Sequence, residues 1–205
     1  MRIDVKGKLE SVYVEVPFDK AKKVFESQGY RIISLSENAY LRMREGKDAF
    51  ISQNGNSIRE AFIYLPSKEI YLTKNSPIME NAEEATECNR KGKEFYINEK
   101  QIEQLKKDVN NKLAVKFPET ENYEIPTDRF GNDAITDFAF GKIAKDYGKF
   151  LNDAGINKMP IWLADFKDKP FARKLWFRNL SARSGLDSDW GIGYDYYGAR
   201  GVCEK

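Results

Sequence analysis

Apolar residues in this chain occur only in short runs, and their spacing switches repeatedly between that of a strand and that of a helix. The longest unbroken run is AFIYL at 61–65 in a chain of 205 residues, far below the roughly 18 residues that indicate a membrane-spanning helix. Residues 9–16 alternate apolar and polar side chains, which is typical of a half-buried strand. The runs 58–65 and 69–73 flank Pro66-Ser67 and predict a hairpin. The pattern predicts a mixed fold and argues against fibrous and membrane classes.

Two longer segments have helical spacing. Asn98 is the predicted N-cap of the first, whose apolar residues recur at intervals of three and four: Ile102, Leu105, Val109 and Leu113. We expect this stripe to face the core. The second helix is predicted from Asn132 to Gly155, and core packing explains its aromatic stripe better than a ligand site does.

Length and composition favour one domain spanning 1–205, since domains usually have roughly 100 to 200 residues. Apolar residues make up 41% of the chain, and 3 Trp, 11 Tyr and 13 Phe supply bulky side chains for a core. The alternative is an N-terminal α/β part, 1–117, and a C-terminal part, 118–205, divided in the stretch from Pro118 to Pro126.

Charge and histidine content narrow the possible functions. The 34 basic and 32 acidic residues are intermixed and give a formal charge of +2, so the sequence lacks the basic patch of a nucleic-acid-binding protein. The chain contains no histidine. This absence excludes Ser-His-Asp and Cys-His nucleophile systems and imidazole metal sites.

The N-terminus and the cysteines bear on cellular location. The first ten residues, MRIDVKGKLE, are charged throughout and do not form a secretory signal peptide. We expect a cytoplasmic or virion-associated protein. Cys88 and Cys203 are too few for a disulfide framework or a zinc site, and two free thiols are favoured over a single bridge.

The C-terminal stretch 178–202, RNLSARSGLDSDWGIGYDYYGARGV, differs in composition from the rest. Lys and Glu together number 41 of 205 residues, so 25 residues should hold about five, and this stretch holds none. It also lacks Gln, Met, Pro and Thr, and it contains five Gly, three Ser, three Asp, three Tyr and one Trp. Tyr and Trp offer a large contact area at little cost in side-chain entropy, and Ser, Asp and Gly add adaptable hydrogen bonding. The composition fits a binding surface, and equally a set of short twisted strands whose rings pack inward.

A resemblance favours the binding surface. The run Leu175-Trp176-Phe177, then Leu180, Ser184, Leu186 and the closing Arg200-Gly201-Val202 with Glu204, resembles the C-terminal variable region of the archaeal and viral target proteins of diversity-generating retroelements. The resemblance implies an α+β, C-type lectin-like fold related in shape to the formylglycine-generating enzyme fold. Short C-terminal strands, in a region of about 175–204, would display a variable face. In that family, randomised adenines yield residue sets without Lys, Glu, Gln and Met, in agreement with this stretch.

The resemblance also implies roles for particular residues. The fixed scaffold would comprise Leu175, Trp176, Phe177, Leu180, Leu186, Arg200, Gly201 and Val202. The ligand-binding residues would be Asn179, Ser181, Arg183, Asp187, Asp189, Trp190, Tyr194, Asp195, Tyr196 and Tyr197. Trp190 and the tyrosines would be the anchors for an unknown protein or glycan ligand, without a cofactor. The aspartates would select a basic or hydroxyl-bearing partner, although each could instead stabilise a turn.

Three other functions stay open at this point. An enzyme without histidine would need paired carboxylates, for example Asp165 with Asp168 or Asp187 with Asp189. A calcium site could use Asp187 and Asp189, but two carboxylates are too few for us to predict a metal. A structural protein could turn the same Tyr-rich surface toward self-association. We expect a binding protein and no enzymatic activity.

Overall fold

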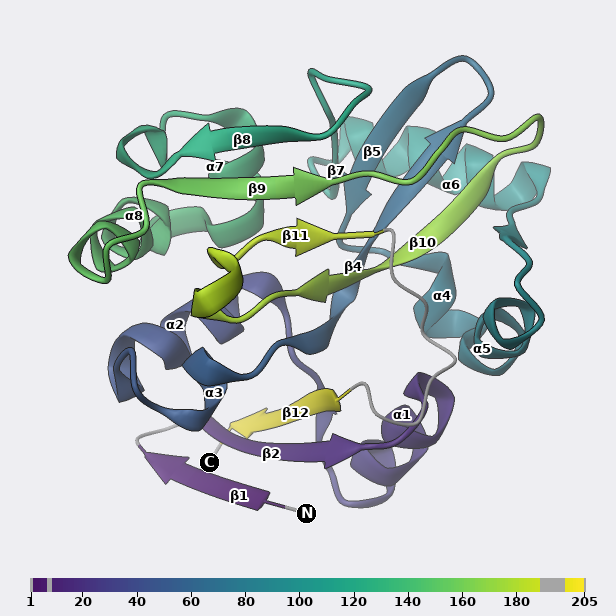
Figure 1. The fold of residues 1–205 in the computed structure, drawn as a ribbon. Coiled ribbons are helices and arrows are strands. Elements are labelled where there is room, and N and C mark those ends of the chain that lie inside the picture. Colours follow the sequence, from purple (N-terminus) through teal and green to yellow (C-terminus); the bar gives the residue numbers. More distant parts are fainter. Residues whose placement is uncertain (1, 7–8, 189–197, 205) are drawn as a thin grey trace.

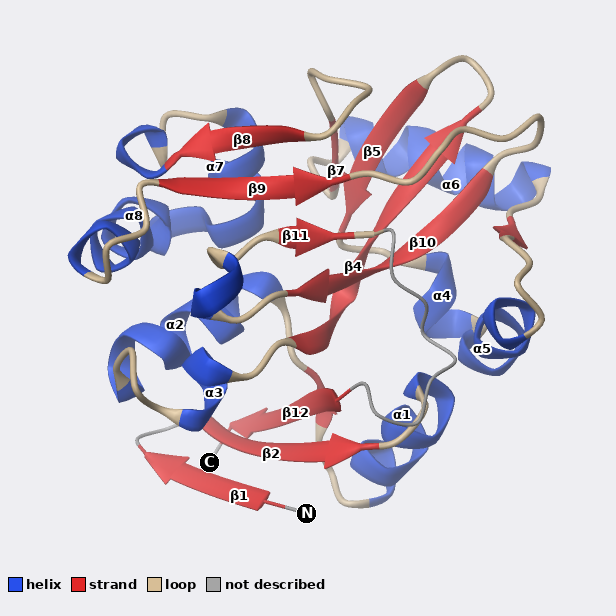
Figure 2. Cartoon of the chain, in the orientation of Figure 1, coloured by secondary structure: helices blue, strands red, loops and turns tan. Residues whose placement is uncertain are grey.

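The computed structural model describes residues 2–6, 9–188 and 198–204. These residues form short strands and helices that alternate along the chain (Figures 1 and 2). The strands are β1 (Arg2–Lys6), β2 (Leu9–Glu15), β3 (Arg31–Ile32), β4 (Asn56–Leu65), β5 (Glu69–Thr73), β6 (Phe95–Tyr96), β7 (Ala114–Lys116), β8 (Tyr123–Pro126), β9 (Lys158–Trp162), β10 (Phe171–Phe177), β11 (Leu186–Asp187) and β12 (Gly198–Glu204). The α-helices are α1 (Phe18–Ser27), α2 (Leu35–Glu45), α3 (Phe50–Gln53), α4 (Pro77–Glu80), α5 (Ala82–Arg90), α6 (Glu99–Asn110), α7 (Ala134–Phe140) and α8 (Ala144–Asp153). Three 3-10 helices are η1 (Thr127–Arg129), η2 (Gly141–Ile143) and η3 (Leu180–Ala182).

The strands join in one mixed sheet with the order β1-β2-β12-β4-β10-β11-β9-β8. Neighbours in this order are antiparallel except β12 with β4 and β11 with β9, which are parallel. The predicted hairpin is confirmed, because β4 and β5 pair from Ala61 with Thr73 to Leu65 with Glu69. The fold is therefore α+β, with α-helices packed around one sheet that contains both parallel and antiparallel strand pairs.

The last strand lies among the first ones. β12 pairs along its length with β2, from Gly198 with Glu15 to Glu204 with Leu9, and it also contacts β3 and β4. Both chain ends therefore lie at the same side of the sheet (Figure 1). The C-terminal segment leaves the sheet after β11 and re-enters it at β12, with β10 and β4 between these two strands.

Two hydrophobic clusters cover the two faces of the sheet. Alternation along β4 shows this directly, because Phe62 and Tyr64 belong to one cluster and Ala61 and Ile63 to the other. The first cluster is rich in aromatic rings and includes residues of α2, α7 and α8. The second is richer in alanine and includes residues of α1, α4, α5 and α6. Each cluster contains residues from before and from after the stretch 118–126, and β4 and β10, one from each side of it, pair with each other.

The helix predicted from 132 to 155 is two helices, and that prediction is wrong in its continuity. Gly141 has φ +58°, a conformation that ends α7 and that side-chain-bearing residues rarely adopt. Asp133, one residue after the predicted start, caps α7 by accepting hydrogen bonds from the backbone N–H of Ile135 and Thr136 at 3.0 and 2.9 Å. The chain continues through η2 into α8.

The stripe predicted on α6 faces the core only in its first half. Asn98 caps the helix as expected, with Oδ1 accepting from the N–H of Gln101 at 3.0 Å. Leu105 is buried, whereas Val109 and Leu113 are 40% and 36% exposed. Leu113 lies beyond the helix, after a turn in which Lys112 has φ +58°. The expectation is therefore wrong for these two residues.

Candidate functional site

The C-terminal segment first turns between β10 and β11, and Asn179 organises this turn. Its Oδ1 accepts hydrogen bonds from the N–H of Ala182 at 3.1 Å and from the hydroxyl of Ser181 at 3.0 Å. Its Nδ2 donates to the carbonyl of Gln53 at 3.0 Å. Asn179 is half-buried and Ser181 is exposed. In the structure, Asn179 thus stabilises the turn, and Ser181 is the residue of the two that projects to the surface.

Arg183 and Ser184 follow with left-handed backbones, φ +56° and +55°. Arg183 is exposed and pairs with Glu124 of β8. Ser184 is fully buried. Two consecutive left-handed residues other than glycine are strained, and such a conformation persists where surrounding contacts fix it.

Those contacts come from a buried arginine on α2. Arg42 is fully buried and donates through Nη1 to the Ser184 hydroxyl at 2.8 Å and to the Tyr147 hydroxyl at 3.2 Å. Its Nη2 donates to the carbonyl of Arg178 at 2.9 Å, and its Cζ lies 4.1 Å from the centroid of the Phe177 ring. The hydroxyls of Tyr147 and Ser184 are 2.5 Å apart. The Arg42 guanidinium therefore fixes the turn from inside the first cluster, where a cation is stable only with such partners.

Asp187 lies in the interior rather than on an exposed face. The side chain is fully buried on β11. Its Oδ2 accepts a hydrogen bond from Nε of Arg178 at 2.7 Å and forms an ion pair with Nη2 of the same residue at 2.5 Å. The Arg178 guanidinium also lies 4.6 Å from the ring centroid of Trp162. The sequence-based placement of Asp187 on the display surface is corrected, because the carboxylate is used in a structural ion pair. The described residues contain no group of three potential metal ligands.

Asp187 stands in a row with two tryptophans. It pairs in register with Trp176 on β10 and with Trp162 on β9, so these three side chains share one face of the sheet. Both tryptophans are half-buried. This face is the one that also carries Ala172 and Lys174, opposite to the face of Leu175 and Phe177.

Ser188 ends the described part of this segment and is firmly held. It is fully buried, and its N–H donates to the carbonyl of Trp162 at 3.1 Å. Its hydroxyl lies 2.5 Å from the hydroxyl of Tyr64 on β4 and donates to the same Trp162 carbonyl at 3.1 Å. Its own carbonyl accepts from Nη1 of Arg173 at 3.3 Å.

Gly198 is the first described residue after 189–197. It begins β12 and lies close to Tyr13. A Cβ at this position would lie 1.9 Å from the hydroxyl oxygen of Tyr13, so a larger residue would displace that ring. Two residues on, Arg200 is buried, donates to the Ser11 hydroxyl at 2.8 Å, and lies over the rings of Tyr13 and Phe50. Burial, together with the Glu15 carboxylate, raises the pKa of Tyr13 to about 12. Both flanks of 189–197 are therefore fixed in the structure.

The remaining ligand-binding residues expected from the sequence lie outside the described residues: Asp189, Trp190, Tyr194, Asp195, Tyr196 and Tyr197. Of the expected scaffold, Leu175, Phe177, Leu180, Leu186, Arg200, Gly201 and Val202 are buried and Trp176 is half-buried. Sequence reasoning missed the residues that hold the segment from a distance, namely Arg42, Tyr64, Tyr147 and Trp162. Nothing in their local sequence marks them, since each contact spans at least 26 residues.

Comparison with known structures identifies the fold. A solved structure from work on the accommodation of massive sequence variation in Nanoarchaeota by the C-type lectin fold matches with a TM-score of 0.69, over 98% of this chain and 99% of that one. This chain has a C-type lectin fold. At 17% sequence identity the likeness establishes the fold alone. No family model matches the sequence, and no curated protein matches it.

The C-type lectin fold here carries no helix, within 2–6, 9–188 and 198–204, of the length and apolar character that a membrane crossing requires. Cys88 and Cys203 are free thiols. Asp165 and Asp168, the carboxylate pair named from the sequence, are both exposed. At the C-terminal segment of this fold, buried polar contacts hold both flanks of 189–197.

Proposed function

We propose that this chain is a ligand-binding display protein whose C-terminal surface is diversified by a retroelement. The whole chain, 1–205, would act as one lectin-like unit, in the variant of the fold related in shape to formylglycine-generating enzymes. The proposed contact residues are Ser181 and Arg183, which the structure exposes, and Asp189, Trp190, Tyr194, Asp195, Tyr196 and Tyr197. The proposal assigns the chain no catalytic role.

The observation that carries the proposal is the fixing of both flanks by contacts that do not involve 189–197. Ser188 is held by Tyr64 and Trp162, and Arg200 by Ser11 and two rings. A scaffold that holds the two ends through residues far from the segment between them can tolerate changes in that segment. The absence of Lys and Glu from 178–202 fits the residue set of such a segment.

The ligand would be a protein or a glycan. A protein partner would cover about 800 Å² on this chain, and a few aromatic residues would contribute most of the affinity. The Asp189 and Asp195 carboxylates would favour basic groups or hydroxyls on the ligand.

A stability experiment tests whether the segment is separable from the core. We would replace Trp190, Tyr194, Tyr196 and Tyr197 together by Ser and measure the melting temperature. We expect a change of less than about 4 °C, equivalent to about 1 kcal/mol in a chain of this size. The matched control is Tyr64→Phe with Ser188→Ala, which removes a flank contact and should lower the melting temperature by more. A loss of more than about 10 °C in the quadruple variant would mean that these rings belong to the core.

A genetic observation tests diversification itself. The coding segment for 179–198 should have an imperfect copy nearby, with differences confined to adenines of the copy, next to a reverse-transcriptase gene. A locus without such a copy would end this part of the proposal and leave ligand binding to be judged separately. Size-exclusion chromatography distinguishes ligand capture from self-assembly, since an assembly surface predicts an oligomer that the four Ser substitutions convert to a monomer.

A further inference from the structure

Lys174 is a buried amine on the face of the sheet opposite to Arg42. It lies on β10 in register with Ala61 of β4, on the face covered by the second hydrophobic cluster, and it is 4% exposed. Its Nζ lies 4.4 Å from the ring centroid of Phe18 on α1. Among residues 2–6, 9–188 and 198–204, no carboxylate forms an ion pair with it.

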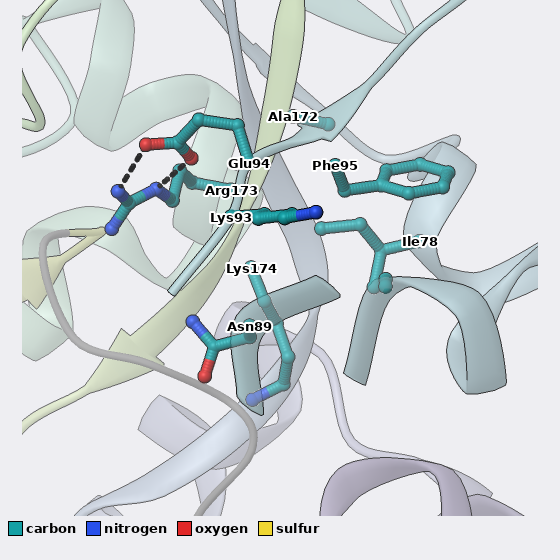
Figure 3. Close-up of a pocket in the computed structure, with 9 residues that line it drawn as sticks. Ile78, Asn89, Lys93, Glu94, Phe95, Ala172, Arg173 and Lys174 are labelled. Carbon is teal, nitrogen blue, oxygen red and sulfur yellow. Dashed lines mark hydrogen bonds and ion pairs between the residues drawn. The ribbon is translucent and has the colours of Figure 1, made fainter. Parts of the chain in front are cut away.

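A small cavity adjoins this side chain. Its volume is about 20 Å³, and its lining includes Ala85. Figure 3 shows Ile78, Asn89, Phe95 and Ala172 around it together with Lys174. The exposed Lys93 also contributes, so the cavity reaches toward the surface. A space of this size holds about one small polar group.

The acid in the cavity lining is already engaged. Glu94 accepts from Nε and Nη2 of Arg173 at 2.7 and 2.6 Å, and Figure 3 shows this pair directed away from the Lys174 amine. Among the described residues, the Lys174 amine contacts the Phe18 ring, which compensates poorly for the desolvation of an ammonium ion. Burial accordingly holds the pKa of Lys174 well below its usual range.

We propose that Lys174 is a reactive amine that captures the carbonyl group of a small aldehyde as an imine. The lone pair of Nζ attacks the carbonyl carbon, and the carbonyl oxygen takes up a proton to give a carbinolamine. Loss of the hydroxyl group together with the remaining amine proton releases water and forms the C=N bond. No oxidant or reductant is needed. A neutral lysine in an apolar pocket is an activated nucleophile of this kind.

The cavity limits what can react. Its volume admits the carbonyl end of an aldehyde, and any longer substituent would extend toward Lys93. This inference is independent of the proposed function, since it uses neither the display residues nor a retroelement. If either proposal fails its test, the other is unaffected.

The test is reductive alkylation of the intact protein with limiting formaldehyde and cyanoborohydride, followed by peptide mass mapping. At pH 7 we expect Lys174 to be modified at least ten times more than the median of the other 22 lysines. Raising the pH to 9 should increase labelling of exposed lysines about a hundredfold and that of Lys174 only slightly, since each pH unit changes their neutral fraction about tenfold. Benzaldehyde, which exceeds the cavity, should label exposed lysines and leave Lys174 unmodified.

Two variants complete the design. Lys174→Met should remove this single adduct, and Lys93→Met, at the rim of the same cavity, should leave it in place. The wild-type peptide map decides the outcome even if Lys174→Met folds poorly. Labelling of Lys174 below the median of the other lysines at pH 7, or labelling that rises with pH in parallel with them, would overturn the proposal.

Discussion

Two buried basic side chains, Arg42 and Lys174, lie on opposite faces of the sheet and have different surroundings. Arg42, in the aromatic cluster, donates three hydrogen bonds, to Ser184, Tyr147 and the carbonyl of Arg178. Lys174, on the face covered by the second cluster, lies against the Phe18 ring and a small cavity. A guanidinium stays protonated in proteins, so its burial requires acceptors, whereas an amine can lose its proton. Arg42 therefore stabilises a turn as a cation, whereas the proposal for Lys174 uses it as a neutral amine.

Removing Arg42 should have the largest effect on stability. Arg42→Ala leaves a cavity and three buried polar groups without their donor, so we expect the free energy of unfolding to fall by about 4 kcal/mol. Arg42→Met keeps most of the volume and should cost roughly half as much. Urea unfolding measures both. A loss below about 1 kcal/mol for Arg42→Ala would show that the turn is held by other contacts.

Glu60 extends the comparison of buried ionisable groups to an acid. Glu60 on β4 is 2% exposed, accepts from the Leu35 N–H at 3.1 Å, and has the Arg59 Nε at 3.9 Å. Burial raises the pKa of Glu60 from 4.5 to about 7. The folded state therefore binds a proton that the unfolded state has lost between these pH values, and stability falls as pH rises through this window.

Glu60→Gln should remove that pH dependence. A shift of this size corresponds to roughly 3 kcal/mol, so the variant should gain about this much relative to the wild type between pH 4.5 and pH 8. Unfolding free energies at both pH values test it, with the exposed Glu121→Gln as the control. Parallel pH profiles for wild type and Glu60→Gln would mean that Glu60 is ionised in the folded state at little cost.

Lys174→Met should stabilise the protein by about 2 kcal/mol at pH 7, because an apolar side chain of similar length replaces a buried amine. The pKa of Lys174 is lowered on folding, so the unfolded state binds the additional proton and wild-type stability rises with pH up to about 10. The advantage of the variant should shrink over that range. A constant difference from pH 6 to pH 10 would contradict a deprotonated Lys174.

Much of the local structure follows from the sequence, while the long-range contacts do not. The β4–β5 hairpin and the Asn98 cap of α6 depend on neighbouring residues, and both are confirmed. The α+β C-type lectin fold, expected from the C-terminal resemblance, is confirmed by the structural match. The insertion of β12 between β2 and β4 joins residues almost two hundred positions apart, which periodicity cannot reveal.

The candidate site shows the same division. Composition marks the unusual stretch 178–202, but it cannot separate surface from interior within it. Asp187, for example, is buried and paired with Arg178. Arg42 lies 142 residues from Ser184 in an ordinary helix, and its role depends on the packing of α2 against the β10–β11 turn. Likewise, Gly141 sits within a helical pattern, and only its positive φ shows that the helix ends there.

The contact between Arg42 and Ser184 can be tested by comparing Ser184 with its neighbour Arg183. The two residues have nearly the same φ, but only the Ser184 side chain contacts Arg42. Arg183→Gly and Ser184→Gly relieve the same left-handed strain, φ +56° and +55°, and carry the same entropic cost in the unfolded chain. Arg183 loses only an exposed ion pair with Glu124, so its variant should stay within about 0.5 kcal/mol of wild type. Ser184 loses the hydroxyl that contacts both Arg42 and Tyr147, so its variant should be less stable than Arg183→Gly by about 1.5 kcal/mol. Equal unfolding free energies for the two variants would show that the Ser184 hydroxyl contributes nothing and that backbone geometry alone holds the turn over Arg42.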